Sequence, residues 1–471
     1  MTTPWTLNEN RVFSANPAVR SRAADLYGTI ADLPIVAPHG HVAPELLADA
    51  HARFTNPAEL FIIPDHYVFR MLYSQGVPME SLGVPREDGG PIETDPRAIW
   101  RTFCEHFHLF QGTPTGLWMK AELVQLFGVD VRPSAETADA LYDQIDARLK
   151  DDDFTVRALF ERFNVEFLTT TDAATADLSV HASIQADGLP VGPTFRPDAA
   201  MQIAHPDWRS TLDALGERSG VTITSLNEFR EALRVRRQQF VDRGAKATDH
   251  GLFTSFIEPL GEQQAESLFK RGLAGEATTE DAEAFHAHML FEMAGMSVDD
   301  GLVMQVHFGS RRNHHTQIYE RFGLDKGADI PVAMDFTRGL HSLLNAYGSD
   351  PRFRLVTFTL DESTYARELA PMAGHYPALR LGAPWWFFDS VLGFERFLDR
   401  VVETAGVYNL AGFNDDTRAF ASIPARHDVW RRAVSNWLAG QVERGLVDAD
   451  AAPDMARWLA YDAAKSAYRL T

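Results

Sequence analysis

Residues 32–41, DLPIVAPHGH, carry the pattern that decides the fold. A short apolar stretch leads into two histidines and a polar segment, as a buried parallel strand does where it ends at the edge of a sheet. Runs of the same kind recur along the chain. They are VEFLTTTD at 165–172, LPVGPTFRP at 189–197, GAKATDHG at 244–251, GLVMQVHFG at 301–309, FRLVTFTLD at 353–361, LRLGAPWWF at 379–387 and YNLAGFNDD at 408–416.

Helical segments separate most of these runs. Residues 228–244, EFREALRVRRQQFVDRG, and 394–406, FERFLDRVVETAG, space their apolar residues three and four apart and end at glycine. This spacing is typical of amphipathic helices. Eight strand-like runs that alternate with helices predict an α/β fold, namely a closed (β/α)8 barrel of the TIM type. Residues 330–336, IPVAMDF, are a ninth candidate strand.

The connection at residues 42–164 is far longer than the others and is rich in aromatic residues at helical spacing, for example AIWRTFCEHFHLF and LWMKAELVQLFGV. We expect a helical insertion after the first strand that caps one end of the barrel. Residues 428–471 form a final helical segment. The chain is therefore predicted to be a single barrel domain over residues 1–471, since such barrels absorb long insertions.

The composition limits the partners. Lys and Arg number 44 against 65 Asp and Glu, a formal net charge of −21, which excludes a broad phosphate-binding face and hence nucleic acid. The N-terminal sequence lacks the regions of a signal peptide, and the sequence has no apolar run of the roughly 18–20 residues that span a membrane. The single cysteine, Cys104, fits a reducing compartment. We expect a cytoplasmic protein with a small-molecule partner, either a monomer or a symmetric homo-oligomer.

The strongest local signal for chemistry is Pro38-His39-Gly40-His41 at the end of the first run. Residues i and i+2 of an extended segment point to the same side, so both imidazoles can meet one cation. Neutral imidazole is a common ligand of zinc and similar ions. His39 and His41 are therefore candidate metal ligands.

Two further runs end in residues that suit such a site. His307 closes the fifth run, and Asp415-Asp416 close the eighth. A carboxylate at the mouth of a barrel can ligate a metal, accept a proton or both. The ends of the strands converge in a parallel barrel, so these side chains are expected to meet His39 and His41.

Arginines stand at comparable positions. Arg196 follows the third run, Arg311 and Arg312 follow the fifth, and Arg418 lies beside Asp416. Guanidinium groups bind carboxylates with two parallel hydrogen bonds, which predicts an anionic substrate inside an otherwise acidic protein.

Aromatic residues complete the candidate site. Trp385 and Trp386 follow the seventh run and offer a flat apolar face for a sugar ring, although a pair of tryptophans in an aromatic run is equally compatible with core packing. Asp65-His66-Tyr67 in the long insertion combine an acid, a base and a phenol, as a lid over a proton-transfer site would. The sequence contains no GxxxxGK[ST], GxSxG, HExxH or GxGxxG motif, which argues against the chemistries that these motifs serve.

These motifs together resemble those of the uronate isomerase (glucuronate isomerase) family, a divergent branch of the amidohydrolase superfamily. The matching segments cover nearly the whole chain. They are PHGH at 38–41, DHYVFRML at 65–72, TTD at 170–172, FRPD at 195–198, KATDH at 246–250, VHFGSRRN at 306–313, WWF at 385–387 and DDTRAF at 415–420.

The resemblance implies a (β/α)8 barrel that binds one divalent ion, usually zinc, near His39, His41 and Asp416. It implies the conversion of D-glucuronate to D-fructuronate and of D-galacturonate to D-tagaturonate, the opening step of hexuronate breakdown. The reaction moves a proton between C2 and C1 of the open-chain sugar.

The same resemblance implies roles for individual residues. Asp416, Arg418, Tyr67 and His39 form the expected catalytic set. The expected substrate contacts are Arg196, Arg312, His66, His307, Trp385 and Trp386, with Arg311 as the neighbouring alternative to Arg312.

Two other interpretations stay open from the sequence. The first is a metal-dependent hydrolase, in which Asp416 activates a metal-bound water. Hydrolytic relatives usually carry a ligand histidine at the sixth strand, and LVTFTLD at 355–361 has none. The second is a sugar-acid-binding protein that has kept the pocket without turnover.

Overall fold

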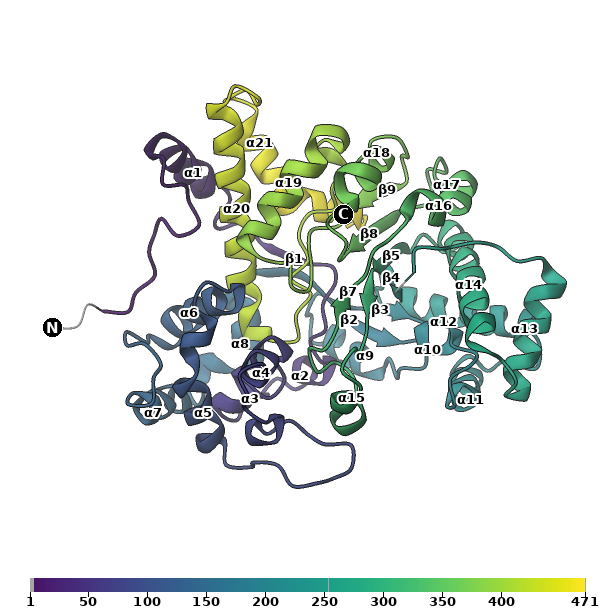
Figure 1. Ribbon diagram of the computed structural model, residues 1–471, viewed down its shortest axis with the longest axis horizontal. Helices are drawn as coiled ribbons and strands as arrows, with labels where there is room; N and C mark the ends of the chain where they lie inside the picture. The colour runs from purple at the N-terminus through teal and green to yellow at the C-terminus, as the bar shows by residue number, and fades with distance from the viewer. Residues whose placement is uncertain (1–3, 253, 471) are drawn as a thin grey trace.

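The computed structural model describes residues 4–252 and 254–470. Its centre is a curled sheet of seven parallel strands in the order β1-β2-β3-β4-β5-β8-β9, in which each strand pairs with the next (Figure 1). The strands are β1 (Ile35–Ala37), β2 (Val165–Ala173), β3 (Val191–Arg196), β4 (Ala247–Leu252), β5 (Val303–Phe308), β8 (Leu355–Thr359) and β9 (Leu379–Leu381).

The sheet is buried on both faces, as its near-continuous apolar strands require. Every residue of β5 and of β8 is buried. Each of the first seven predicted runs overlaps one of these strands, so the prediction of a parallel α/β sheet is confirmed.

The prediction of an eighth strand at residues 408–416 is wrong for the sheet as described. This run makes a single parallel bridge, between Leu381 and Leu410. Gly412 adopts φ of +75° and Asp416 φ of +44°, and both values lie outside the β region, so the run cannot continue as a strand. The ninth candidate is not a barrel strand either, because β7 (Ile330–Pro331) pairs antiparallel with β6 (Ser310–Arg311) outside the main sheet.

Helices cover the connections after β2. They are α9 (Ser179–Ala186), α10 (Asp198–Met201), α11 (Trp208–Ser219), α12 (Leu226–Asp242), α13 (Glu262–Ala274), α14 (Thr279–Asp300), α15 (Thr316–Phe322), α16 (Phe336–Gly339), α17 (His341–Tyr347), α18 (Ala370–Ala373) and α19 (Val391–Ala405). Both quoted amphipathic segments are helical, as α12 and α19. In α19 the Ser390 side chain accepts a hydrogen bond from Gly393 N at the start, and Gly406 at φ of +70° ends the helix.

The segment between β1 and β2 folds into short helices, drawn together in the lower left of Figure 1. They are α2 (Pro44–Ala48), α3 (Pro57–Phe61), α4 (His66–Tyr73), α5 (Pro96–Glu105), α6 (Pro114–Phe127), α7 (Ala138–Arg148) and α8 (Val156–Arg162). A hydrophobic cluster that includes Trp100, Phe103, Cys104 and Phe107 fills the space between them. The single cysteine is thus a buried core residue.

The two ends of the chain pack together. Helix α1 (Pro17–Ile30) lies against α20 (Ile423–Glu443), which α21 (Ala452–Arg457) and α22 (Ala463–Ala467) follow. Arg431 of α20 donates hydrogen bonds to the carbonyls of Ala31 and Leu33, just before β1. Among the described residues, none of the helices combines the length and the apolarity needed to span a membrane.

Candidate active site

The two histidines of the PHGH segment lie immediately after β1. Backbone contacts fix this segment on both sides: the Thr171 hydroxyl donates to the Gly40 carbonyl at 2.9 Å, and His41 N donates to the Thr417 carbonyl at 3.0 Å. The His39 side chain is buried, whereas that of His41 is one quarter exposed. The end of β1 is therefore held against the loop that carries Asp416.

Asp416 and His307 complete a compact cluster with these histidines. Asp416 Oδ1 lies 3.2 Å from His39 Nε2 and 3.1 Å from His41 Nε2. The His307 ring stacks on the His39 ring with centroids 4.7 Å apart. One ligand atom each from His39, His307 and Asp416 lie within 4.8 Å of one another. The structure thus brings together the four residues, from the ends of β1 and β5 and from the loop that carries Asp416.

The donor set fits a divalent cation. His307 Nε2 is buried and finds no hydrogen-bond partner within residues 4–252 and 254–470. Buried polar atoms are normally satisfied, so an orphaned imidazole nitrogen beside a carboxylate indicates a missing partner. Imidazole nitrogens with one carboxylate oxygen are the ligands that zinc and similar ions prefer.

The charges of the cluster follow from burial and from the neighbours of each group. Burial lowers the pKa values of His41 and His307, which favours the neutral imidazole that binds metal. Burial opposes the charge of His39 as well, but Asp249 and Asp416 outweigh it and raise its pKa. Burial also opposes the charge of Asp416, yet His39 and His41 hold its pKa well below the usual range, so the carboxylate is ionised.

Asp249 was missed by the sequence analysis as a site residue. It belongs to β4, and its Oδ1 lies 2.8 Å from His307 Nδ1 while its Oδ2 lies 3.3 Å from Arg196 Nη1. Burial opposes its charge, but Arg196 and His307 hold the pKa of Asp249 well below the usual range. The available signal was its place in the KATDH segment at 246–250, which belongs to one of the predicted strand-like runs.

The arginines converge on the same strand ends. Arg196 ends β3 and pairs with Asp198 at 3.0 Å as well as with Asp249. A Cβ built on Gly251 of β4 would lie 2.9 Å from Arg196 Nη2 and 3.9 Å from Arg312 Nη2, so the two guanidinium groups are close neighbours.

Arg312 and Arg418 lie at the more open side of this site. Both arginines are exposed, but the Arg312 guanidinium lies 5.7 Å from the centre of the Trp385 ring, whereas Arg311 sits in β6 opposite Ile330. Arg312, rather than Arg311, therefore faces the site. Arg418 Nη2 donates to Asp325 Oδ2 at 2.5 Å.

Helix α4 brings Tyr67 to the site. Asp65 caps this helix, because its carboxylate accepts a hydrogen bond from Tyr67 N at 2.8 Å. The buried Tyr67 hydroxyl donates to Asp389 Oδ2 at 2.8 Å, and Arg426 Nη1 donates to the same oxygen at 3.0 Å. Burial, and then the charge of Asp389, raise the pKa of Tyr67 well above its ordinary value, which keeps the phenol protonated.

Asp389 and Arg426 were also missed by the sequence analysis. Asp389 lies two residues after WWF, and Arg426 lies six residues after DDTRAF, but neither run by itself indicates a partner. Burial raises the pKa of Asp389, with Arg426 as the main opposing charge. The pair explains how a buried carboxylate is kept beside Tyr67.

The tryptophan pair packs directly on the candidate residues. The Trp386 ring lies 4.3 Å from that of His66 and 4.4 Å from that of Tyr67, and the Trp385 ring lies 4.8 Å from that of His307, all edge to face. Both indoles are buried. The next residue, Phe387, adopts φ of +72°, which is strained for a bulky side chain and marks a constrained loop.

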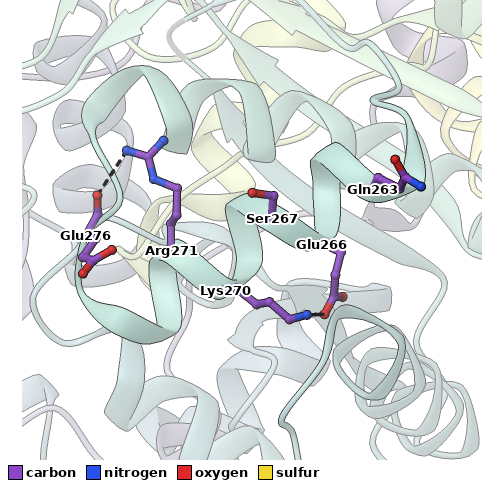
Figure 2. Close-up of a pocket in the computed structure, with 6 residues that line it drawn as sticks. All are labelled: Gln263, Glu266, Ser267, Lys270, Arg271 and Glu276. Carbon is purple, nitrogen blue, oxygen red and sulfur yellow. Dashed lines mark hydrogen bonds and ion pairs between the residues drawn. The ribbon is translucent and has the colours of Figure 1, made fainter.

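Within the part of the chain that the structure describes, hollows also lie outside this cluster. One, of about 420 Å³, is on the surface of α13 and is lined by Gln263, Glu266, Ser267, Lys270, Arg271 and Glu276. Figure 2 shows that Lys270 pairs with Glu266 and that Arg271 donates to the backbone carbonyl of Glu276. Arg271 also forms an ion pair with Asp281, so both cations of this hollow already have acidic partners. A second hollow, of about 200 Å³, is lined by Tyr67, Arg70 and Phe387 among others and adjoins the site.

The fold and the cluster define a class: a mixed α/β protein with a curled parallel sheet whose strand ends carry histidines, an aspartate and arginines suited to a divalent metal and an anion. The chain belongs to the glucuronate isomerase family, whose model matches residues 12–468. The predicted family is confirmed.

Individual relatives agree with this assignment. A uronate isomerase from Nostoc punctiforme is 55% identical over 465 residues, which cover 98% of each chain. The crystal structure of glucuronate isomerase from Caulobacter crescentus superposes with a TM-score of 0.97 at 47% identity and covers 99% of this chain and 98% of its own. A uronate isomerase structure from Thermotoga maritima gives a TM-score of 0.91 at 27% identity, with 98% and 99% covered.

Proposed function

We propose that this protein is an aldose–ketose isomerase of hexuronates that interconverts D-glucuronate with D-fructuronate and D-galacturonate with D-tagaturonate. One observation carries the proposal beyond the family assignment. Arg196 and Arg312 lie as neighbours beside Gly251, and Asp249 joins Arg196 to the His307 of the histidine–aspartate cluster. An anion clamp and an acid–base group are thereby available within one site.

The reaction has three requirements. After the sugar ring opens, a base removes the proton from C2 and the electrons of that bond form an enediolate. A proton then returns to C1, and the C2 oxygen becomes a carbonyl. The protein must supply the base, stabilise the negative oxygen and hold the distant carboxylate.

Asp416 is the proposed base. Its carboxylate is ionised, as its lowered pKa requires. Arg418, two residues further on, stabilises the enediolate oxygen. Tyr67 assists proton transfer on an oxygen, and Asp389 holds its hydroxyl in place. The carbon proton therefore moves through Asp416 and the oxygen proton through Tyr67.

Arg196 and Arg312 form the proposed clamp for the substrate carboxylate, since paired guanidinium groups match a carboxylate in geometry and charge. His66, His307, Trp385 and Trp386 line the space between the clamp and the base. The edge-to-face packing of the indoles on these histidines supports this assignment.

The proposed metal is one zinc ion. His39, His41 and Asp416 would hold it, and His307 lies close enough either to join them or to contact the substrate. When bound, the ion would bind substrate oxygens and favour negative charge on them.

We further propose that the chain is a single barrel domain in which residues 410–417 occupy the eighth position. Ala411 N donates to the Leu381 carbonyl of β9, and Thr417 accepts from His41 beyond β1, so this segment bridges the two edges of the sheet. The helices between β1 and β2 would then cap the end of the barrel, where α4 delivers Tyr67.

The test is incubation of the purified protein with D-glucuronate and, separately, with D-galacturonate, followed by detection of the keto acids. Formation of either product supports the proposal and ranks the two sugars. Absence of both products from a folded, metal-loaded protein contradicts it. A control with D-glucose, which lacks the carboxylate, tests the clamp in the same assay and is expected to give no product.

A further inference from the structure

The segment between α15 and β7, residues 323–329, is here called the strap. Its C-terminal end is fixed to the residues that follow β6. Asp329 accepts hydrogen bonds from Arg312 Nη1 and from Asn313 N, both at 3.0 Å, and the Ala328 carbonyl accepts one from His314 N at 2.8 Å. The C-terminal end of the strap is therefore held in place beside Arg312.

The middle of the strap presses on α4. Gly327 adopts φ of +73°, and a Cβ added there would lie 2.7 Å from Arg70 Cβ and 3.0 Å from the His66 carbonyl oxygen. The Cβ of Arg70 is bonded directly to the backbone of α4 and the His66 carbonyl is part of it, so neither atom can move away freely and glycine is required for this close approach. The strap thus spans from β7 to the helix that delivers His66 and Tyr67.

Besides Asp329, the strap places a second carboxylate, that of Asp325, among the arginines of the site. Asp325, at φ of +59°, accepts a hydrogen bond from Arg418 Nη2 at 2.5 Å and lies 3.9 Å from Arg312 Nη1. Burial opposes its charge, but Arg418, Arg312 and His66 together lower the pKa of Asp325. The negative charge of Asp325 also contributes to the raised pKa of Arg196, after those of Asp249 and Asp198.

The groups around Asp325 are the ones assigned above to the anionic sugar, namely Arg418, Arg312, His66 and Arg196. The side chain of aspartate ends in the same carboxylate as a hexuronate, with the same preference for guanidinium partners. A carboxylate on Arg418 and a substrate anion cannot occupy the same donors at the same time.

We propose that Asp325 is an internal substitute for the anionic groups of the substrate. A sugar acid must therefore displace Asp325, with the part of the strap that carries it, before Arg418 and Arg312 can bind the sugar. This inference rests on the proposed function. Its consequence is a competition within the chain: Asp325 stabilises the arginines in the free protein and lowers the apparent affinity for anionic sugars, leaving neutral sugars unaffected.

The opposite expectation follows if Asp325 only positions Arg418. Loss of its charge would then release the Arg418 side chain, and sugar acids would bind more weakly. The sign of the change therefore separates the two roles.

The experiment compares two inhibitors that differ only in the carboxylate. L-Gulonate is D-glucuronate with its aldehyde reduced to an alcohol, and D-glucitol is the same chain with the carboxylate reduced as well. Their inhibition constants are measured for the wild type, for Asp325→Asn, which keeps the shape and removes the charge, and for Asp88→Asn. The last variant removes an equal charge from an exposed pair with Arg86 and controls for the overall field.

The expected result is a fall of about two- to fivefold in the inhibition constant of L-gulonate for Asp325→Asn, the range for a half-exposed ion pair. D-Glucitol and Asp88→Asn should show no change. A constant for L-gulonate that rises or stays the same, or an equal shift for both inhibitors, would overturn the proposal.

Turnover of the two hexuronates by the wild type is measured first. Absence of keto acid from either hexuronate would overturn the proposed function. Normal turnover combined with an unchanged or raised constant for L-gulonate would overturn the role of Asp325 alone.

Discussion

The imidazole of His307, on β5, lies with its Nδ1 2.8 Å from Asp249 Oδ1, on the neighbouring strand β4. This contact orients the ring and turns Nε2 toward His39 and Asp416. A carboxylate behind a ligand histidine also raises the basicity of the ring, which strengthens binding to a metal. The geometry of the candidate metal site therefore depends on a residue that does not belong to it.

Asp249→Asn is expected to lower both metal affinity and kcat by about 10- to 100-fold, the usual effect of losing such a partner. Metal content after dialysis against a weak chelator, together with kcat at saturating zinc, checks this. Asp152→Asn, at a fully exposed position, serves as the control. Full metal content and normal kcat in Asp249→Asn would remove Asp249 from the account.

Gly251→Ala tests the neighbouring arginines. The new methyl group would lie 2.9 Å from Arg196 Nη2, the mobile end of a long side chain, so the guanidinium must shift while the backbone stays. We expect KM for hexuronates to rise about tenfold, since misplacing a binding group by an ångström costs up to about a hundredfold, with little change in stability. Gly440→Ala, which adds a methyl group in open space, is the control for the assay. An unchanged KM would show that Arg196 does not bind the substrate.

The buried pair of Asp389 and Arg426 is expected to control stability. Asp389→Ala leaves the Arg426 guanidinium, whose side chain is 2% exposed, without its ionic partner. Removal of one member of such a pair costs about 3–5 kcal/mol. Urea unfolding measures the change, and Asp88→Ala, which breaks an exposed pair, should cost far less. Equal losses in the two variants would contradict the importance of burial here.

Glu122 of α6 gives a pH-dependent contribution. Burial, and then the charge of Asp65, raise its pKa to about 8, so the folded state keeps the proton that the unfolded chain releases near its ordinary value of 4.5. The unfolded state binds fewer protons between these values, and stability falls as pH rises, by about 1.4 kcal/mol per pH unit. Unfolding of wild type and Glu122→Gln at pH 5.5, 6.5 and 7.5 tests this. The free energy of unfolding of the wild type should fall steadily relative to that of Glu122→Gln as the pH rises. Parallel pH dependences of the two proteins would refute the prediction.

Much of the sheet was predictable because each strand is a short apolar run that can be recognised from the local sequence alone. The eighth run shows the limit. It has the same composition as the others, but Gly412 and Asp416 take positive φ values that a hydrophobic pattern does not encode. A single backbone bridge replaces the strand that the pattern predicts.

The candidate site divides in a similar way. His39, His307 and Asp416 were found because each closes a predicted apolar run and the architecture makes the ends of these runs converge. Asp389 was not found, because its role depends on a hydrogen bond from Tyr67, which lies 322 positions away in the sequence. Asp325 was missed for the same reason, since its partner Arg418 is 93 positions away and on another element.

The proton transfer assigned to Asp416 is the central claim, and kcat of Asp416→Asn with D-glucuronate and D-galacturonate tests it most directly. The wild type should form keto acid from at least one sugar, and the variant should be slower by at least the roughly 10²–10⁴-fold that general acid–base catalysis contributes. Near-normal turnover in a folded Asp416→Asn protein would contradict the account, because the C2 proton would then have another acceptor.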